Sequence, residues 1–93
     1  MSFNIFPIGI GDIFVNNKTK ENVIIANVYV KTPNYGGIKY PIEITLIKED
    51  DTNISFIEYI TSSNEFLKKY TLVNQNAYKI KRNVQISYNV EKI

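Results

Sequence analysis

The side chains that most often carry out catalysis are scarce in this sequence, which contains no His and no Cys. Imidazole bases, thiolate nucleophiles, disulfides and the usual zinc and haem ligands are thereby removed. Carboxylates remain, and three are adjacent at Glu49, Asp50 and Asp51. Paired carboxylates perform acid–base chemistry only when their environments separate their pKa values, and a polar run in a turn offers no such difference. We therefore expect a solvated turn here, no catalytic residue and no enzyme activity.

Two further motifs resemble cofactor or metal sites only in part. A calcium loop beginning at Asp51 would place Phe56 where the sharp turn needs Gly, and Ser62 where the bidentate Glu belongs. Gly9-Ile10-Gly11 lacks the third Gly of a dinucleotide loop, because Phe14 stands at that position and no helical pattern follows. We expect no metal and no cofactor, and assign these glycines to backbone freedom before the first strand.

Basic and aromatic side chains occur together in the C-terminal third, a combination typical of single-strand nucleic-acid binding. This candidate binding patch consists of Lys68, Lys69, Tyr70, Lys79, Lys81 and Arg82. The alternative is that these bases lie near the five acids between residues 49 and 65 and neutralise them. The net charge of +2 does not by itself imply a nucleic-acid or membrane partner.

Protein–protein contact is the function that we expect, with a nucleic-acid-binding small barrel as the alternative. Aromatic residues make up 13% of the chain, and the N-terminal arm (1–10) is rich in apolar side chains. Exposed strand edges recruit partners because their amides are already aligned. The expected partner is another protein or a second copy bound through strand edges. No membrane is expected, since no apolar run approaches the ~20 residues that span a bilayer.

The elements that would position these residues are mostly strands. From Ile38 to Lys48 the even positions up to Leu46 are apolar and the odd positions largely polar, which predicts a strand with one face in the core. Val23 to Lys31 is apolar on both faces, with Ile24, Ala26, Val28 and Val30 sharing one of them. Such a strand is either central or partly covered. Short turns between the strands favour antiparallel neighbours, and Ser62-x-x-Glu65 predicts a capped helix near 63–70.

From Tyr78 to Glu91 the even positions are apolar and the odd positions polar, with Arg82 as the lone exception on the apolar face. A hairpin with Arg82-Asn83 as a two-residue loop would mix apolar and polar side chains on one face, and no Gly or Pro marks a turn. We therefore predict one long strand, reaching about 50 Å, that either bends across two sheets or projects and pairs with a second copy or a partner. Its inward residues would be Tyr78, Ile80, Val84, Ile86, Tyr88 and Val90, and its outward residues Lys79, Lys81, Gln85 and Ser87.

Three stretches resemble a known family. Gly11-Asp12-Ile13-Phe14-Val15, then a polar turn and Val23-Ile24-Ile25-Ala26-Asn27-Val28, resembles small SH3-like barrel proteins of phages and low-GC bacteria, in which a Gly-Asp pair opens the first strand. Glu65-Phe66-Leu67-Lys68-Lys69-Tyr70-Thr71-Leu72-Val73 resembles their helical turn before the last barrel strand. The resemblance covers residues 9–73 and implies a fold. It implies no activity.

These patterns predict one mainly β domain over residues 1–93, a small antiparallel SH3-like barrel with one short helix and an extended C-terminal strand. The arm (1–10) and an appended C-terminal strand region (74–93) lie outside the barrel. The expected core is Ile24, Val28, Ile42, Ile44, Leu46, Phe56, Phe66 and Leu72.

The composition also suggests an origin. Ile, Asn, Lys and Tyr have A/T-rich codons and supply 45 of the 93 positions, which is typical of a low-GC bacterium or its phage. The N-terminus lacks the basic start and long apolar stretch of a signal peptide. We therefore expect a cytoplasmic protein of a bacterium or of a phage-infected cell, in a phage accessory or virion role.

Overall fold

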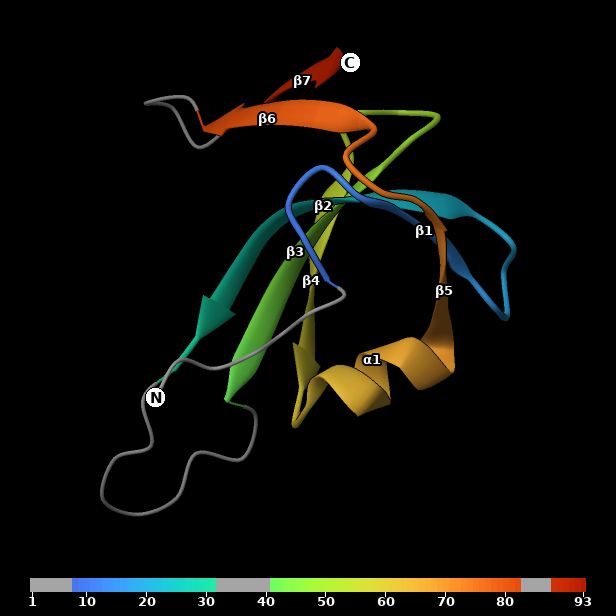
Figure 1. Ribbon diagram of the computed structural model, residues 1–93, viewed down its shortest axis with the longest axis vertical. Helices are drawn as coiled ribbons and strands as arrows, with labels where there is room; N and C mark the ends of the chain where they lie inside the picture. The colour runs from blue at the N-terminus through green and yellow to red at the C-terminus, as the bar shows by residue number, and fades with distance from the viewer. Residues whose placement is uncertain (1–7, 32–40, 83–87) are drawn as a thin grey trace.

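Antiparallel strands dominate the fold, with one short helix between two of them (Figure 1). The computed structural model describes residues 8–31, 41–82 and 88–93, so the expectations for Ile38, Tyr40, Val84, Ile86, Gln85 and Ser87 lie outside the described residues. The prediction of a small, mainly β antiparallel domain with one helix is confirmed. The elements are β1 (Ile13–Asn16), β2 (Asn22–Val30), β3 (Ile42–Lys48), β4 (Ser55–Ile60), α1 (Ser63–Lys69), β5 (Tyr70–Asn74), β6 (Tyr78–Arg82) and β7 (Tyr88–Lys92).

Five of these strands form one sheet in the order β4-β3-β2-β1-β5, and all the pairings are antiparallel. The sheet curls, but within the described residues no backbone ladder joins its two edge strands, β4 and β5. The expected barrel is therefore open along one side. Helix α1 connects these two edges in sequence and lies beside them (Figure 1).

The helix forms where the capping residues predict it. The Ser62 hydroxyl accepts a hydrogen bond from the Glu65 amide, one of the free donors at the helix start, and the Glu65 carboxylate accepts the amide of Thr61, the residue before the cap. Phe66 is fully buried, with its ring edge-on to Phe14 at a centroid distance of 5.1 Å. The helix thus fills the open side of the barrel with an aromatic side chain.

The main core lies on the inner face of the sheet. Most of the expected core is confirmed: Ile42, Ile44, Leu46 and Phe66 are buried there, while Val28, Phe56 and Leu72 are half-buried against it. Ile24 is also buried, but it belongs to a second cluster on the opposite face. Other buried members of the main core are Ile8, Phe14, Val23, Ile25, Ile60 and Tyr70.

A bulge in β2 explains why Ile24 and Val28 face opposite sides. Pairing with β3 shifts by one residue between Ile25 and Asn27, so Ala26 is the extra residue. Before the bulge, even positions face outward; after it, Val28 and Val30 pack on the main core. The prediction that residues 24, 26, 28 and 30 share one face was therefore wrong, whereas a central strand with both faces partly apolar was correct.

The C-terminal region is a hairpin, so the prediction of one long strand was wrong. β6 and β7 pair antiparallel, with Ile80 opposite Val90 and Arg82 opposite Tyr88. Only a hairpin with a two-residue loop at Arg82-Asn83 would mix apolar and polar side chains on one face. An odd number of connecting residues pairs even positions with even positions, and so keeps the apolar face intact. Assembly driven by an over-long strand consequently loses its structural basis.

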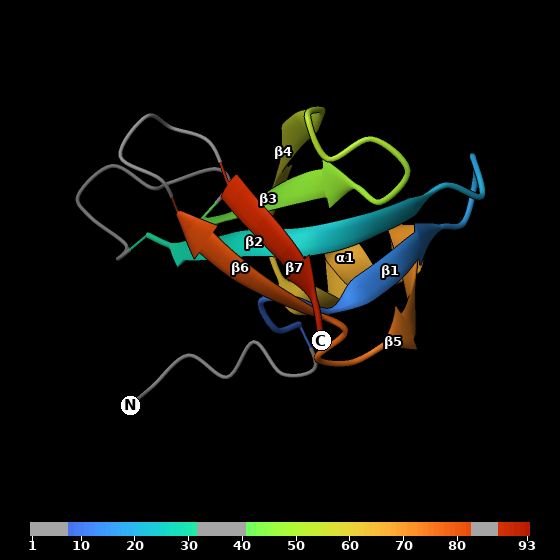
Figure 2. The same ribbon diagram turned by 90° about the horizontal axis from the view of Figure 1, so that it is seen from above.

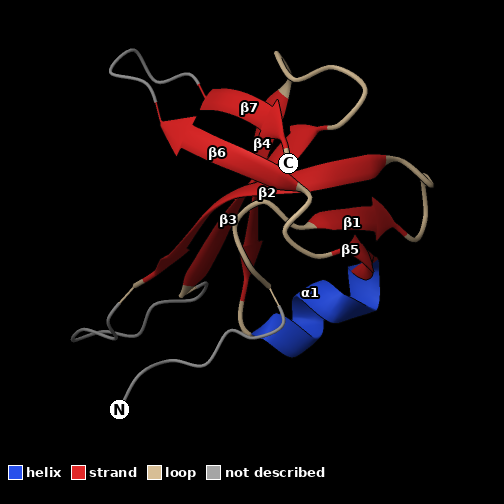
Figure 3. Ribbon diagram, turned by 45° about the horizontal axis from the view of Figure 1, so that its top comes forward, coloured by secondary structure: helices blue, strands red, loops and turns tan. Residues whose placement is uncertain are grey.

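The hairpin covers part of the outer face of the sheet, crossing β2 as seen from above (Figure 2). Its inward side chains are those expected from parity, and they pack against Ile24, Ala26 and Ile47; they are Tyr78, Ile80, Tyr88 and Val90. Lys79 and Lys81 are exposed on its other side, as predicted. The sheet therefore lies between α1 on one side and the hairpin on the other (Figure 3).

A junction of backbone contacts attaches the hairpin to the start of β1. The Gly11 carbonyl accepts the amides of Ala77 and Tyr78, at 3.0 and 3.1 Å. Gly11 has a φ of +91°, and a Cβ there would lie 2.1 Å from the Tyr78 carbonyl oxygen, which requires glycine. Asp12, 3% exposed, accepts the Gly9 and Asn76 amides, both at 2.9 Å. The backbone freedom expected of the first glycines is thus confirmed at Gly11.

Candidate functional site

Among the described residues, the hairpin covers the outer face of the sheet as far as Ala26, and no other element covers β2, β3 and β4 beyond it. Strand register aligns Tyr29 with Glu43 and Glu43 with Tyr59, forming one row across the three strands. The next row contains Asn27, Thr45 and Ile57. Three large side chains on this face are about half exposed: Tyr29 at 56%, Tyr59 at 49% and Ile57 at 45%. The rows therefore present aromatic and aliphatic surface to solvent in the isolated chain.

A groove of about 580 Å³ follows these rows and ends at the hairpin. We call it the outer groove. Its lining consists of Asn27, Tyr29, Glu43, Thr45, Ser55, Phe56, Ile57 and Tyr88. Because Tyr88 belongs to β7 and the other residues to the sheet, the hairpin contributes one wall. The groove thus combines apolar surface with a few hydroxyl, amide and carboxylate groups, which suits binding better than chemistry.

The carboxylate in the groove has a partner. Glu43 Oε2 lies 2.6 Å from Lys31 Nζ, and this hydrogen bond is the main cause that raises the pKa of Lys31. Both side chains are partly exposed, so the pair contributes little to stability. Its effect is local, because it holds the Glu43 carboxylate at one place between the two tyrosines.

Strand β4 forms one edge of the sheet and one side of this face. Its outer side chains are Ser55, Ile57 and Tyr59, all exposed. Glu58 points inward, and its carboxylate accepts the hydroxyl of Tyr70 at 2.8 Å. The edge is thus marked by apolar side chains on the groove side and by a paired acid on the core side.

The basic and aromatic residues predicted as a binding patch are not brought together. Lys68 and Lys69 end helix α1, whereas Lys79 and Lys81 lie on β6, on the other side of the sheet (Figure 3). Tyr70 is buried, so its ring is not available to stack on a base. The side chain of Arg82 lies outside the described residues. Lys68 and Lys69 instead line a cavity of about 320 Å³ with Lys18, Asn16, Asn17 and Glu58.

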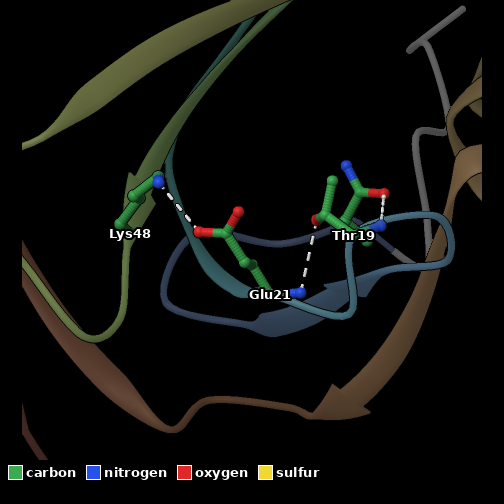
Figure 4. Close-up of polar contacts among 4 residues, drawn as sticks. Thr19, Glu21 and Lys48 are labelled. Atoms are coloured by element: carbon green, nitrogen blue, oxygen red, sulfur yellow. Dashed lines mark hydrogen bonds and ion pairs between the residues drawn. The ribbon is translucent and has the colours of Figure 1, made fainter.

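A third cavity, of about 300 Å³, lies under the β1–β2 turn and is lined in part by Glu21 and Lys48. Glu21 Oε2 is 2.8 Å from Lys48 Nζ, a contact that raises the pKa of that lysine (Figure 4). The Thr19 hydroxyl accepts the Glu21 amide, and Asn16 Oδ1 accepts the Lys18 and Thr19 amides. These groups satisfy one another, so we assign them to fixing the turn.

Two features are absent from the parts of the chain that the structure describes. There, no three acidic side chains are grouped so as to hold a metal ion. No helix among the described residues has the length and apolar character needed to cross a bilayer. Comparisons with protein-family models, curated proteins and solved structures find no match to this chain. The site must therefore be judged on its own geometry.

Sequence reasoning missed the outer groove as a site. The signal that could have found it is the apolar character of both faces of β4, where Phe56 and Ile60 alternate with Ile57 and Tyr59. An edge strand needs only one apolar face when it covers a core. A second apolar face on such a strand indicates that something else covers it.

Proposed function

We propose that this protein is a non-catalytic protein-binding module whose outer groove receives a segment of a partner polypeptide. The observation that carries the proposal is the half-exposed set Tyr29, Ile57 and Tyr59, gathered on one sheet face beside an edge strand. Tyrosine is enriched at protein interfaces because its ring is apolar and its hydroxyl tolerates water. The adjoining Asn27 and Thr45 supply the few polar groups that would orient a bound backbone.

The charges near the groove favour a polypeptide over nucleic acid. Glu43 in the groove is neutralised by Lys31, which leaves no unpaired base there among the described residues, and Asp50 and Asp51 are exposed at the turn that leads into β4. A phosphate backbone requires lysines and arginines at the contact surface. The exposed Lys79 and Lys81 are on the outer side of the hairpin instead.

The biological setting is part of the proposal. The abundance of residue types with A/T-rich codons supports a phage or low-GC bacterial origin, and within that setting we propose a role as an accessory or virion protein. We place its action in the cytoplasm of the bacterial or infected cell. The Gly11-Asp12 pair lies before β1, and helix α1 lies before β5. This order supports the proposal that the module is related to small SH3-like barrels.

Selection from a displayed random-peptide library tests the function. Peptides enriched on the wild-type protein should bind the double variant Tyr29→Ser/Tyr59→Ser at least about tenfold more weakly, which corresponds to about 1.4 kcal/mol. Val73→Ser is the matched control, because Val73 is 53% exposed but lies on β5, away from the groove. Binding should survive in this control.

Either of two results would contradict the proposed function. One is a selection that enriches no peptide on the wild-type protein. The other is enriched peptides that bind the double variant as tightly as the wild type, because they would be using another surface. Circular dichroism of each variant establishes that the fold is retained.

A further inference from the structure

The backbone of β4 offers hydrogen-bonding groups along its free edge. The Lys48 amide donates to the Ile54 carbonyl, so this pair is a hydrogen-bonded pair of the β3–β4 ladder. Hydrogen-bonded and non-bonded pairs alternate in antiparallel sheets. Phe56, Glu58 and Ile60 therefore bond to β3, while the amides and carbonyls of Ser55, Ile57 and Tyr59 point away from the sheet.

These outward groups have no backbone partner among the described residues, where β4 pairs with β3 alone. The same three residues carry the exposed side chains of the groove face. A strand added to this edge would thus continue the sheet and extend the apolar rows at the same time. Backbone bonds would give such a complex affinity, and alternate side chains would give it specificity.

The start of this edge is acidic. Between residues 49 and 65 the chain contains five acids and no base. Glu58 accepts from Tyr70 and Glu49 accepts from Asn22 and Tyr78, so the exposed acids beside the edge are Asp50 and Asp51. Asp50 and Asp51 lie at the start of the strand, whereas Glu65, just after its end, accepts the Thr61 amide and lies near Lys68 and Lys69. Lys48, the nearest base at the start of the strand, is already paired with Glu21.

We propose that the free edge of β4 binds an extended cationic segment of a partner protein, which adds to the sheet as a sixth strand. This inference rests on the proposed protein-binding function and specifies the partner's chemistry. Alternate apolar side chains of the segment pack on Ile57 and Tyr59. Its lysines or arginines lie next to Asp50 and Asp51, where opposite charges lower the energy of the complex and speed its formation.

A second copy of this chain fits the edge less well because of the same charges. A two-fold pairing of β4 with itself, centred on Ile57, aligns position 51 of one copy with position 63 of the other. This brings Asp50 and Asp51 towards Glu65 of the second copy, so acids approach each other at both ends, with Lys68 and Lys69 one helical turn further along. Like charges at facing positions are destabilising. These acids therefore disfavour pairing of the edge with a second copy, and they favour pairing with a basic strand.

The test uses a fluorescently labelled synthetic peptide of alternating lysine and valine, with binding measured by anisotropy. The control peptide carries glutamate in place of lysine. In the protein, Ile57→Pro removes the amide of residue 57, which points away from β3. An edge strand accepts proline at such a position because no bond to β3 is lost. Ile57→Thr is its matched control, because it shortens the side chain and retains the amide.

We expect the lysine peptide to bind at least about tenfold more tightly than the glutamate peptide, and binding to weaken with salt. Ile57→Pro should weaken binding about tenfold relative to Ile57→Thr. The double variant Asp50→Lys/Asp51→Lys should produce a similar loss without touching the ladder. It therefore keeps the inference testable if Ile57→Pro does not fold.

Three results would overturn the inference: equal binding of both peptides, equal binding by the proline and threonine variants, or a wild-type dimer that Ile57→Pro converts to a monomer. The last would identify a second copy as the occupant. Library peptides that require Tyr29 and Tyr59, but are not cationic or bind Ile57→Pro unchanged, would refute this inference and leave the proposed function standing. A library selection that enriches no peptide on the wild-type protein would refute both this inference and the proposed function.

Discussion

The side chain of Tyr70 bridges the side of the barrel that no backbone pairing closes. It is 1% exposed, stacks on Phe66 at a centroid distance of 4.5 Å, and donates its hydroxyl to Glu58 Oε2 at 2.8 Å. Tyr70 begins β5 and Glu58 lies on β4, so one side-chain hydrogen bond joins the two edges of the sheet. Tyr70→Phe removes this bond and keeps the aromatic packing.

The expected loss of stability follows from the burial of the two partners. A hydrogen bond to a charged group contributes about 1.5–3 kcal/mol. Because Glu58 is only half-buried, water can partly replace the hydroxyl, and we expect a loss of about 1–2 kcal/mol. With an m-value of about 1–1.5 kcal/mol/M, the urea midpoint falls by roughly 1 M.

The matched control removes another tyrosine–glutamate hydrogen bond, at a position that is more exposed to solvent. Tyr78 donates its hydroxyl to Glu49 Oε2, also at 2.8 Å, on the hairpin. Its surroundings are more solvated, so Tyr78→Phe should cost only about 0.5 kcal/mol. Equal urea midpoints for Tyr70→Phe and the wild type, or equal losses in the two variants, would refute the argument that the buried bond stabilises the contact between β4 and β5.

High pH gives a second measurement of the same bond. Burial, followed by the hydrogen bond to Glu58, raises the pKa of Tyr70 above its ordinary value of 10.0. The folded state thus favours the protonated hydroxyl, and this stabilisation is complete below about pH 10 and lost as the pH rises further. From about pH 9.5 to 11, wild-type stability should fall more steeply than that of Tyr70→Phe.

Two further substitutions and one deletion test the core and the hairpin junction. Gly11→Ala should lower stability by more than about 2 kcal/mol, because its φ is positive and its Cβ would clash with a backbone carbonyl; thermal unfolding checks this. Ile44→Ala should cost about 2–5 kcal/mol in urea unfolding, since Ile44 is fully buried in the main core. Deleting residues 77–93 uncovers Ile24 and Ile47, so it should lower the melting temperature and increase binding of a hydrophobic dye.

Much of the fold was predictable from local patterns. The alternation in β3 placed Ile42, Ile44 and Leu46 correctly in the core, and Ser62 with Glu65 marked the helix start. These predictions succeeded because side-chain period and capping are properties of a few adjacent residues.

The errors arose where pairing between distant segments decides the outcome. The bulge at Ala26 depends on register with β3, and nothing in residues 23–31 alone marks it. The β6–β7 hairpin has a connection without Gly or Pro, and its stability comes from packing on Ile24 and Ile47. The grouping of Lys68 with Lys79 was wrong for the same reason. The two residues are close in sequence, but the chain turns between β5 and β6 and places them on different sides of the sheet.

The contrast between β3 and β4 explains why we assign a partner to the outer groove. Where the hairpin covers the sheet, the outer face is apolar, as at Ile47. Where the hairpin ends, β3 becomes polar at Thr45 and Glu43, as a solvated face should. On β4, the cross-strand neighbours of these two residues are Ile57 and Tyr59, which no described element covers. A face selected only for solvation would have remained polar there, so the apolar edge is best explained by a strand that binds to it.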